Sequence, residues 1–125
     1  MTHFTNHIKN LATIPFLAAV PVVAAPGVAS AQPAASAADL ETARELIVKG
    51  RELRDKGDLA GALEKLRAAH ALAHTPITGI ELARTHVALK QPLEARDVCL
   101  GIGRMPVTRE ETSRSKEARD EAAKI

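Results

Sequence analysis

The sequence predicts an all-α protein of about five helices that follows an N-terminal signal segment. Beyond residue 38, apolar residues recur three and four positions apart, and no run of alternating β-branched residues indicates a strand. Capping residues and the helix breakers Gly and Pro stand between these apolar stretches. Before Asp39 the only formally charged side chain is Lys9, so the composition changes where the helices are predicted to begin.

Residues 1–31 have the pattern of a cleaved secretory signal peptide. An apolar run at 11–25 is followed by Ala29 and Ala31, the small residues of an A-x-A cleavage site before Gln32. The run is shorter than the ~20 residues that a membrane-spanning helix needs, so we predict cleavage and not anchoring. We therefore expect a periplasmic or secreted protein that meets the membrane only transiently, through the signal segment.

A flexible leader is predicted at 32–38, and the first helix is predicted at 39–55. Either Ser36 or Asp39 can cap this helix, because "SAAD" fits the capping box in which the first side chain accepts a backbone N–H bond. The apolar side of the helix has residues at helical spacing and needs a partner to cover it.

A short connection leads to the second predicted helix, at 59–73. Gly57 suits the left-handed position after the first helix, and Asp58 suits the N-cap of the second. So short a connection forces the two helices to be antiparallel neighbours.

A second helix pair is predicted next. Thr75 and Pro76 fit the N-cap and first position of the third helix, although "TGIE" at Thr78–Glu81 offers a competing capping box one turn later. Pro92 opens the fourth helix. We expect this helix to end at Gly101, Gly103 and Pro106.

The segment 108–125 is predicted to be a closing helix capped by "TREE" at Thr108–Glu111. It has few apolar residues and rows of opposite charges, which support an isolated helix by about 0.2–0.5 kcal/mol per pair. We therefore expect it to be largely solvated.

The two predicted helix pairs have nearly the same layout. Ala62 and Ala95 are 33 residues apart, close to the 34-residue period of the tetratricopeptide repeat, and the segment 43–107 resembles two degenerate copies of that family. Small residues at the matching places would let helix backbones approach closely. The aromatic places of the family hold aliphatic residues, His or Cys, and Lys49 stands where an apolar residue is usual. The predicted packing positions are Gly50, Leu53, Ala62, Leu66, Ala69, Leu82, Ala83 and Ala95.

The resemblance implies two helical hairpins at 39–107 and a non-enzymatic protein–protein interaction or scaffold module of the bacterial cell envelope. Its partner would be another protein or a peptide. An alternative is the N-terminal helical part of a longer, membrane-associated regulatory or sensory envelope protein. Coding sequence in frame beyond Ile125 would favour that alternative.

Several arginines are candidate ligand-binding residues. They either line a concave groove for an acidic peptide tail, as in tetratricopeptide clamps, or form an ordinary solvated surface. These residues are Arg44, Arg51, Arg54, Arg84 and Arg96.

The composition argues against nucleic-acid binding. The 17 basic and 15 acidic residues are intermixed, so there is no basic footprint, and both Phe residues lie within the predicted signal peptide. No aromatic platform for bases is expected in the mature chain. Its core must consist of Leu, Ile, Val and Ala.

The sequence offers weak candidates for chemistry, and we expect no catalytic, cofactor or metal site. His70 and His74 share one helix face. Together with His86 and Cys99 they could supply the imidazole nitrogens and the thiolate of a zinc site. We prefer a role for the first two in complementing the dipole at the end of the second helix, and a buried position for Cys99. A Cys99–His86 dyad would be inert if buried, and nothing organises Ser36, Ser113 and Ser115 for nucleophilic catalysis.

Overall fold

The computed structural model describes residues 33–125, so the predicted signal peptide and its cleavage residues Ala29, Ala31 and Gln32 lie outside the described residues. Within 33–125 there are five α-helices and no strand, which confirms the all-α class. The helices are α1 (Ala37–Asp55), α2 (Leu59–Leu72), α3 (Pro76–Ala88), α4 (Pro92–Arg104) and α5 (Ser113–Ala122). No helix in this part of the chain is both long and apolar enough to cross a membrane.

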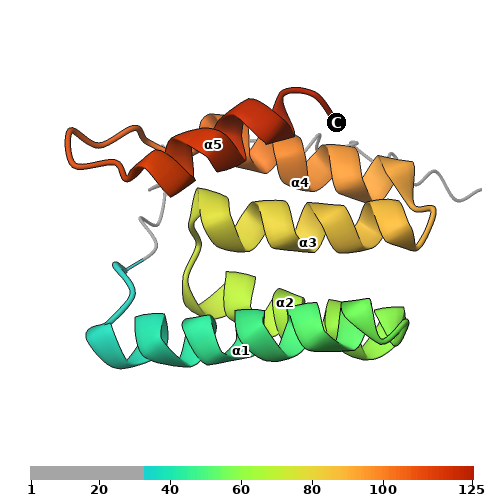
Figure 1. Cartoon of the computed structure of the whole chain (residues 1–125). Coiled ribbons are helices and arrows are strands. Elements are labelled where there is room, and N and C mark those ends of the chain that lie inside the picture. The colour runs from blue at the N-terminus through green and yellow to red at the C-terminus, as the bar shows by residue number, and fades with distance from the viewer. Residues whose placement is uncertain (1–32) are drawn as a thin grey trace, which may run out of the picture. The chain divides into compact units, whose positions relative to one another are not determined.

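The helices pack as two antiparallel pairs and a fifth helix. Helix α1 packs against α2 and α3 against α4, while contacts between α2 and α3 join the two pairs. Helix α5 lies along α3 and α4 (Figure 1). Consequently α1, α3 and α5 are displayed together on one side of the molecule, and this side holds the candidate site.

The start of α1 shows the predicted capping box. Ser36 Oγ accepts a bond from the backbone N–H of Asp39 at 3.1 Å, and Asp39 Oδ2 accepts one from the Ser36 N–H at 3.0 Å. Hydrogen bonds from Ser36 lower the pKa of Asp39. The helix begins at Ala37, two residues before the predicted start, because Ser36 and not Asp39 is the N-cap.

The turn between α1 and α2 recurs between α3 and α4. Gly57 has φ 85°, and Lys90, 33 residues later, has φ 57°. The N–H of Asp58 donates back to α1 at 2.9 Å, and the N–H of Gln91 makes the matching bond to α3 at 2.9 Å. Asp58 also caps α2 through its carboxylate, as predicted, whereas Gln91 makes no side-chain cap.

Two buried apolar clusters form the core, one centred on each helix pair, and Val98 packs against both. Gly50 and Leu66 explain the close approach of α1 and α2, since a Cβ added at Gly50 would lie 2.6 Å from Leu66 Cγ. Leu53, one of the predicted packing positions, is only partly buried. The other predicted packing positions are buried: Gly50, Ala62, Leu66, Ala69, Leu82, Ala83 and Ala95.

Two predicted helix boundaries in the second pair are corrected. Helix α3 starts after Thr75, and Thr78 completes the capping box with it, which eliminates the competing start at Thr78–Glu81. Helix α4 continues through Gly101 and Gly103. A glycine in a helix costs only about 1 kcal/mol, and the fully buried Ile102 between these two anchors the last turn.

The last helix starts later than predicted. Its N-cap is Thr112, whose Oγ1 accepts a bond from Ser115 N–H at 3.2 Å, so the predicted cap at Thr108–Glu111 was wrong. That segment forms a turn closed by a bond from Glu111 N–H to Thr108 O at 3.2 Å. The carboxylate of Glu111 instead binds Arg119, so tertiary pairing overrides the local capping signal.

Candidate functional site

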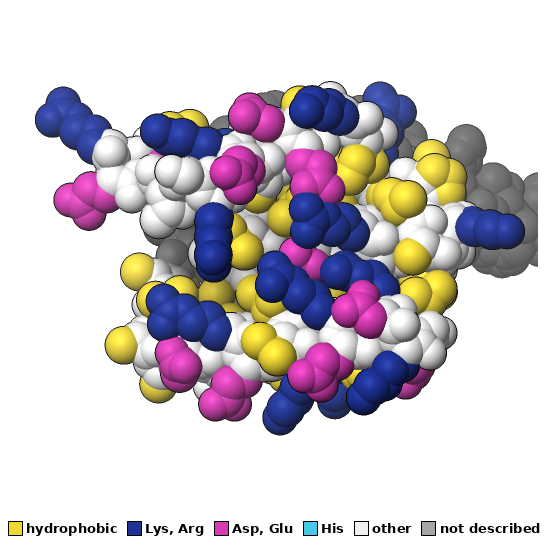
Figure 2. Space-filling view, viewed as in Figure 1, with side chains coloured by type: hydrophobic (Ala, Val, Ile, Leu, Met, Phe, Trp, Pro, Cys, Tyr) yellow, Lys and Arg dark blue, Asp and Glu magenta, His cyan; other side chains and the backbone are white. Residues whose placement is uncertain are grey.

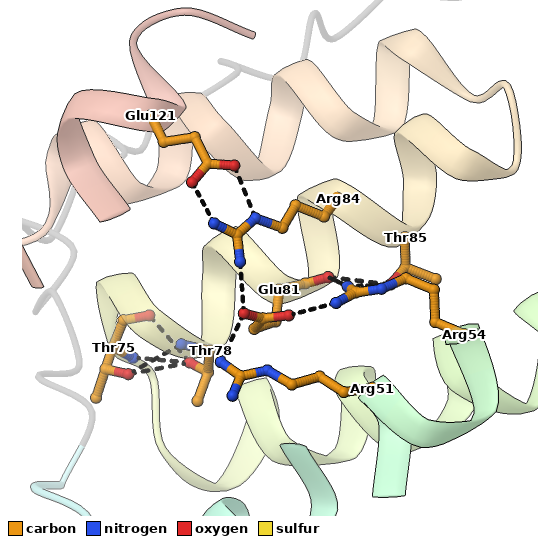
Figure 3. A network of polar contacts seen from close by, with 8 residues as sticks. All are labelled: Arg51, Arg54, Thr75, Thr78, Glu81, Arg84, Thr85 and Glu121. Carbon is orange, nitrogen blue, oxygen red and sulfur yellow. Dashed lines mark hydrogen bonds and ion pairs between the residues drawn. The ribbon is translucent and has the colours of Figure 1, made fainter. Parts of the chain in front are cut away.

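A buried carboxylate on α3 organises the face formed by α1, α3 and α5. Glu81 is 1% exposed, and three guanidinium groups surround it. Its Oε1 accepts bonds from Arg51 and Arg84, each at 2.7 Å, and its Oε2 accepts one from Arg54 at 3.0 Å (Figure 3). The carboxylate therefore fixes two arginines of α1 and one of its own helix.

Arg84 extends this network to α5. Its Nε donates to Glu121 Oε1 at 2.7 Å, and its Nη2 bonds the second carboxylate oxygen, a bidentate pair (Figure 3). Arg84 thus bridges two carboxylates, one buried and one partly exposed. Bidentate pairing is the geometry in which arginine binds carboxylates most specifically.

The charges within the network determine the protonation states. Burial alone would raise the pKa of Glu81, but the hydrogen bonds and charges of the three arginines outweigh burial and lower that pKa. The hydrogen bond from Arg84 lowers the pKa of Glu121, and the same bond raises the pKa of Arg84. Glu81, Arg84 and Glu121 are consequently charged at neutral pH.

The network borders an open groove of about 560 Å³ between α1, α3 and α5. Figure 2 shows Lys and Arg side chains gathered over this face, with apolar side chains between them. The apolar lining consists of Ile47, Val48, Ile77, Ile80 and Ala118, and the charged lining of Arg44, Arg51, Arg84, Arg114, Glu81, Glu117 and Glu121. The groove therefore combines apolar side chains with a charged rim that holds four arginines and three glutamates.

The structure divides the predicted groove arginines into three groups. Arg44, Arg51 and Arg84 line the groove, as the clamp interpretation requires. Arg54 does not line it, because both of its terminal nitrogens face α3, where they bind Glu81 and Thr85. Arg96 lies on α4, beside a different hollow.

Four charged residues of this site were missed in the sequence. Glu81 was assigned only to a capping box, Glu121 was predicted to be a solvated surface residue, and Arg114 and Glu117 carried no predicted role. A charged residue amid apolar neighbours ("GIELA") is the one signal that could have indicated a buried Glu81. Arg114 and Glu121 carry no comparable signal, because their place depends on how α5 packs.

The histidines and the cysteine do not converge. His70 Nδ1 lies 2.8 Å from Thr78 Oγ1, and His86 Nδ1 lies 2.8 Å from Gln91 Oε1, so each ring has a structural partner. Among residues 33–125, no three His, Cys, Asp or Glu side chains are grouped as metal ligands. Cys99 is buried as predicted, and burial, with the charge of Glu121, raises the pKa of its thiol.

His70 does not carry the charge that dipole complementation requires. Burial, and secondly the charge of His74, lower its pKa to about 4. It is neutral at neutral pH, so the predicted role as a cation at the end of α2 was wrong for this residue. Its ring instead stacks on His74, with centroids 4.4 Å apart, and joins α2 to α3 through Thr78.

The three serines lie at the start of helices. Ser36 caps α1, and Ser113 and Ser115 lie in the first turn of α5. In the described part of the chain, no hydrogen bond joins any of them to a histidine.

Comparison with known proteins gives no match: no protein-family model, no curated protein and no solved structure corresponds to the chain. The resemblance to tetratricopeptide repeats therefore stays a prediction from the residue pattern.

Proposed function

We propose that residues 33–125 form a non-enzymatic, tetratricopeptide-like protein-binding module. Its ligand is an acidic, partly apolar peptide segment that binds in the groove of α1, α3 and α5. The observation that carries the proposal is the combination of an apolar lining with four arginines, two of which, Arg51 and Arg84, are held by the buried Glu81.

Unused hydrogen-bond donors on the rim favour an acidic ligand. Arg51 gives one bond to Glu81 and keeps its other nitrogens for a ligand, while its side chain is 48% exposed. Arg44 pairs only with Glu41, a highly exposed partner that contributes little to stability. Arg114 forms no ion pair among the described residues. A ligand carboxylate can bind these groups without breaking the buried network.

The repeated hairpin geometry supports the family part of the proposal. Turns 33 residues apart share a left-handed residue and the same backbone bond, and the matched small residues Ala62 and Ala95 are both fully buried. Modules built from such pairs present one helix of each pair on a common face, where peptides bind. Here α1 and α3 form that face, together with α5.

We place the module in the cell envelope or outside the cell, on the strength of the signal-like pattern at 1–31. Mass spectrometry of the protein recovered from an exporting host should give Gln32, or its cyclised form, as the first residue. An intact Met1 would contradict this location.

The binding proposal is tested with a fluorescein-labelled 12-residue peptide of Glu and Leu, and with a second peptide in which Lys replaces Glu. We expect anisotropy to show binding of the acidic peptide only. Arg44→Ala with Arg114→Ala should weaken it about tenfold or more, because both arginines lie on the rim.

The matched control is Arg67→Ala with Arg109→Ala, which removes two exposed arginines that lie outside the groove. Equal binding of the two peptides, or equal losses in the two double variants, would refute the groove assignment.

A further inference from the structure

A second hollow, of about 490 Å³, lies between α4 and α5. One face of α4 lines it at helical spacing: Arg96, Cys99, Leu100, Gly103 and Arg104. Helix α5 adds the small residues Ala122 and Ala123. This hollow shares no lining residue with the groove of α1 and α3, so it is a separate surface.

The hollow exposes apolar side chains that the fold leaves without cover. Leu100 is 47% exposed and Ile125 is 44% exposed, and both line it. Its floor contains Cys99 and Ala122, which are buried. These two side chains offer a partner apolar surface beside the buried floor.

No contact within residues 33–125 explains why residue 103 is a glycine. A Cβ added at Gly50 or Gly79 would lie less than 3 Å from a buried side chain, so the fold requires those two glycines. A Cβ added at Gly103 meets no atom within 4 Å, and Gly103 does not have the positive φ that would favour glycine. A glycine inside a helix is unfavourable relative to alanine. Gly101 on the same helix has equally open space but lies outside the hollow, whereas at Gly103 the missing side chain leaves the hollow open to a partner.

Two arginines that have no ion pair line this hollow. Arg96 and Arg104 form no ion pair among the described residues, and no Asp or Glu is among the lining residues, although the charge of Glu121 acts on Cys99 in the floor. They are eight residues apart, or about 12 Å along the helix. Arg119, the third arginine, is held by Glu111 and by backbone carbonyls at the end of α4. The two free cations thus flank an apolar strip two turns long.

We propose that this hollow binds an amphipathic α-helix of a partner protein, with an apolar stripe facing Leu100 and acidic residues about two turns apart facing Arg96 and Arg104. A helix fits because the hollow lies alongside α4 and α5 and is lined by glycine and alanine. The acidic character follows from the two unpaired arginines. The proposal does not depend on the peptide groove, which lies on other residues.

The probe is a labelled 18-residue helical peptide with a Leu/Ala stripe and two Glu residues eight positions apart, compared with the same peptide carrying Lys at those positions. We expect saturable binding of the Glu peptide, a gain in its helicity, and weakening by salt. Gly103→Leu should weaken binding about tenfold or more by filling the hollow. Gly101→Leu is the matched control, because it adds the same side chain to the same helix outside the hollow.

The charges are tested with Arg96→Glu/Arg104→Glu, which should abolish binding of the Glu peptide and favour the Lys peptide. Arg67→Glu/Arg109→Glu makes the same change in net charge elsewhere and should leave binding intact, as should Arg44→Ala/Arg114→Ala in the peptide groove. Thermal unfolding verifies that every variant is folded.

Three results would overturn the proposal. The first is no binding of the Glu peptide at about 1 mM. The second is equal binding of both peptides. The third is a self-associated chain in sedimentation that Gly103→Leu dissociates, because a second copy would then occupy the hollow.

Discussion

The side chain of Leu66 fills the space in which a β-carbon of residue 50 would lie. A Cβ built on Gly50 would be 2.6 Å from Leu66 Cγ and 2.8 Å from Cδ2. Leu66 is fully buried and cannot move away without disturbing its cluster. The distance between α1 and α2 therefore depends on a glycine on one helix and a leucine on the other.

Gly50→Ala should lower the free energy of unfolding by about 1–3 kcal/mol, because the added methyl group overpacks the contact with Leu66. Gly101→Ala is the control: it makes the same chemical change inside a helix where nothing lies within 4 Å. It should raise stability by about 0.5–1 kcal/mol. Urea unfolding followed by circular dichroism measures both, and a shift of the same sign in both would contradict the packing described.

Glu81→Gln should lower the free energy of unfolding by about 2–4 kcal/mol, because it leaves three guanidinium groups around a site without a negative charge. Glu41→Gln, which removes an exposed partner of Arg44, should change it by less than about 0.5 kcal/mol. If chemical denaturation gives the two variants equal stability, Glu81 does not organise the α1–α3–α5 face.

Stability should fall as the pH drops from about 6.5 to about 4. The pKa of His70 is lowered to about 4 in the folded protein, against an ordinary value of 6.5, so in this window the unfolded chain binds a proton that the folded protein does not. The loss should reach about 1–3 kcal/mol, because the ring is only partly shielded from water. Well above pH 6.5, where this histidine is neutral in the unfolded chain as well, His70 contributes no pH dependence.

His70→Gln should remove most of this dependence of the free energy of unfolding on pH, as measured by urea titrations at pH 7, 5 and 4. His74→Gln should retain most of it, since burial lowers the pKa of His70 more than the charge of His74 does. The lowered pKa of Glu81 acts in a more acidic range, where its stabilisation is lost as the pH falls through the folded-state value. An unchanged slope in His70→Gln would contradict the assignment to this ring.

Thr112→Ala should lower the free energy of unfolding by about 1 kcal/mol, because Thr112 Oγ1 caps α5. Thr108→Ala should have almost no effect, since the Thr108 side chain makes no capping bond to α5. Hydrogen exchange of the first amides of α5 would distinguish the two variants. Faster exchange in Thr108→Ala alone would restore the earlier helix start.

The helix pattern could be predicted from the sequence because its signals are local. Ser36, Gly57, Asp58 and Thr75 act on backbone groups a few residues away, and each has its predicted role. Buried small residues such as Ala62 were also predictable, from their spacing along a helix.

The polar contacts between helices were not predictable in this way. Whether Arg54 reaches the groove or Glu81 depends on the rotation of α1 against α3, which no short stretch of sequence encodes. The same reason explains the misplaced start of α5, where "TREE" satisfies the local rule but Glu111 pairs with Arg119 eight residues on. For His70, the lowered pKa arises from packing that the sequence does not display.

Helix α5 forms a wall of both hollows, with Ala118 and Glu121 on one side and Ala122 and Ala123 on the other. It is joined to α3 and α4 by two buried alanines, by the ion pair between Glu121 and Arg84, and by the bond from Arg119 to the carbonyl of Ile102. An occupant that shifted this helix from one side would change the shape of the opposite hollow, because the same helix lines both. By thermodynamic reciprocity, any such coupling would act equally in both directions.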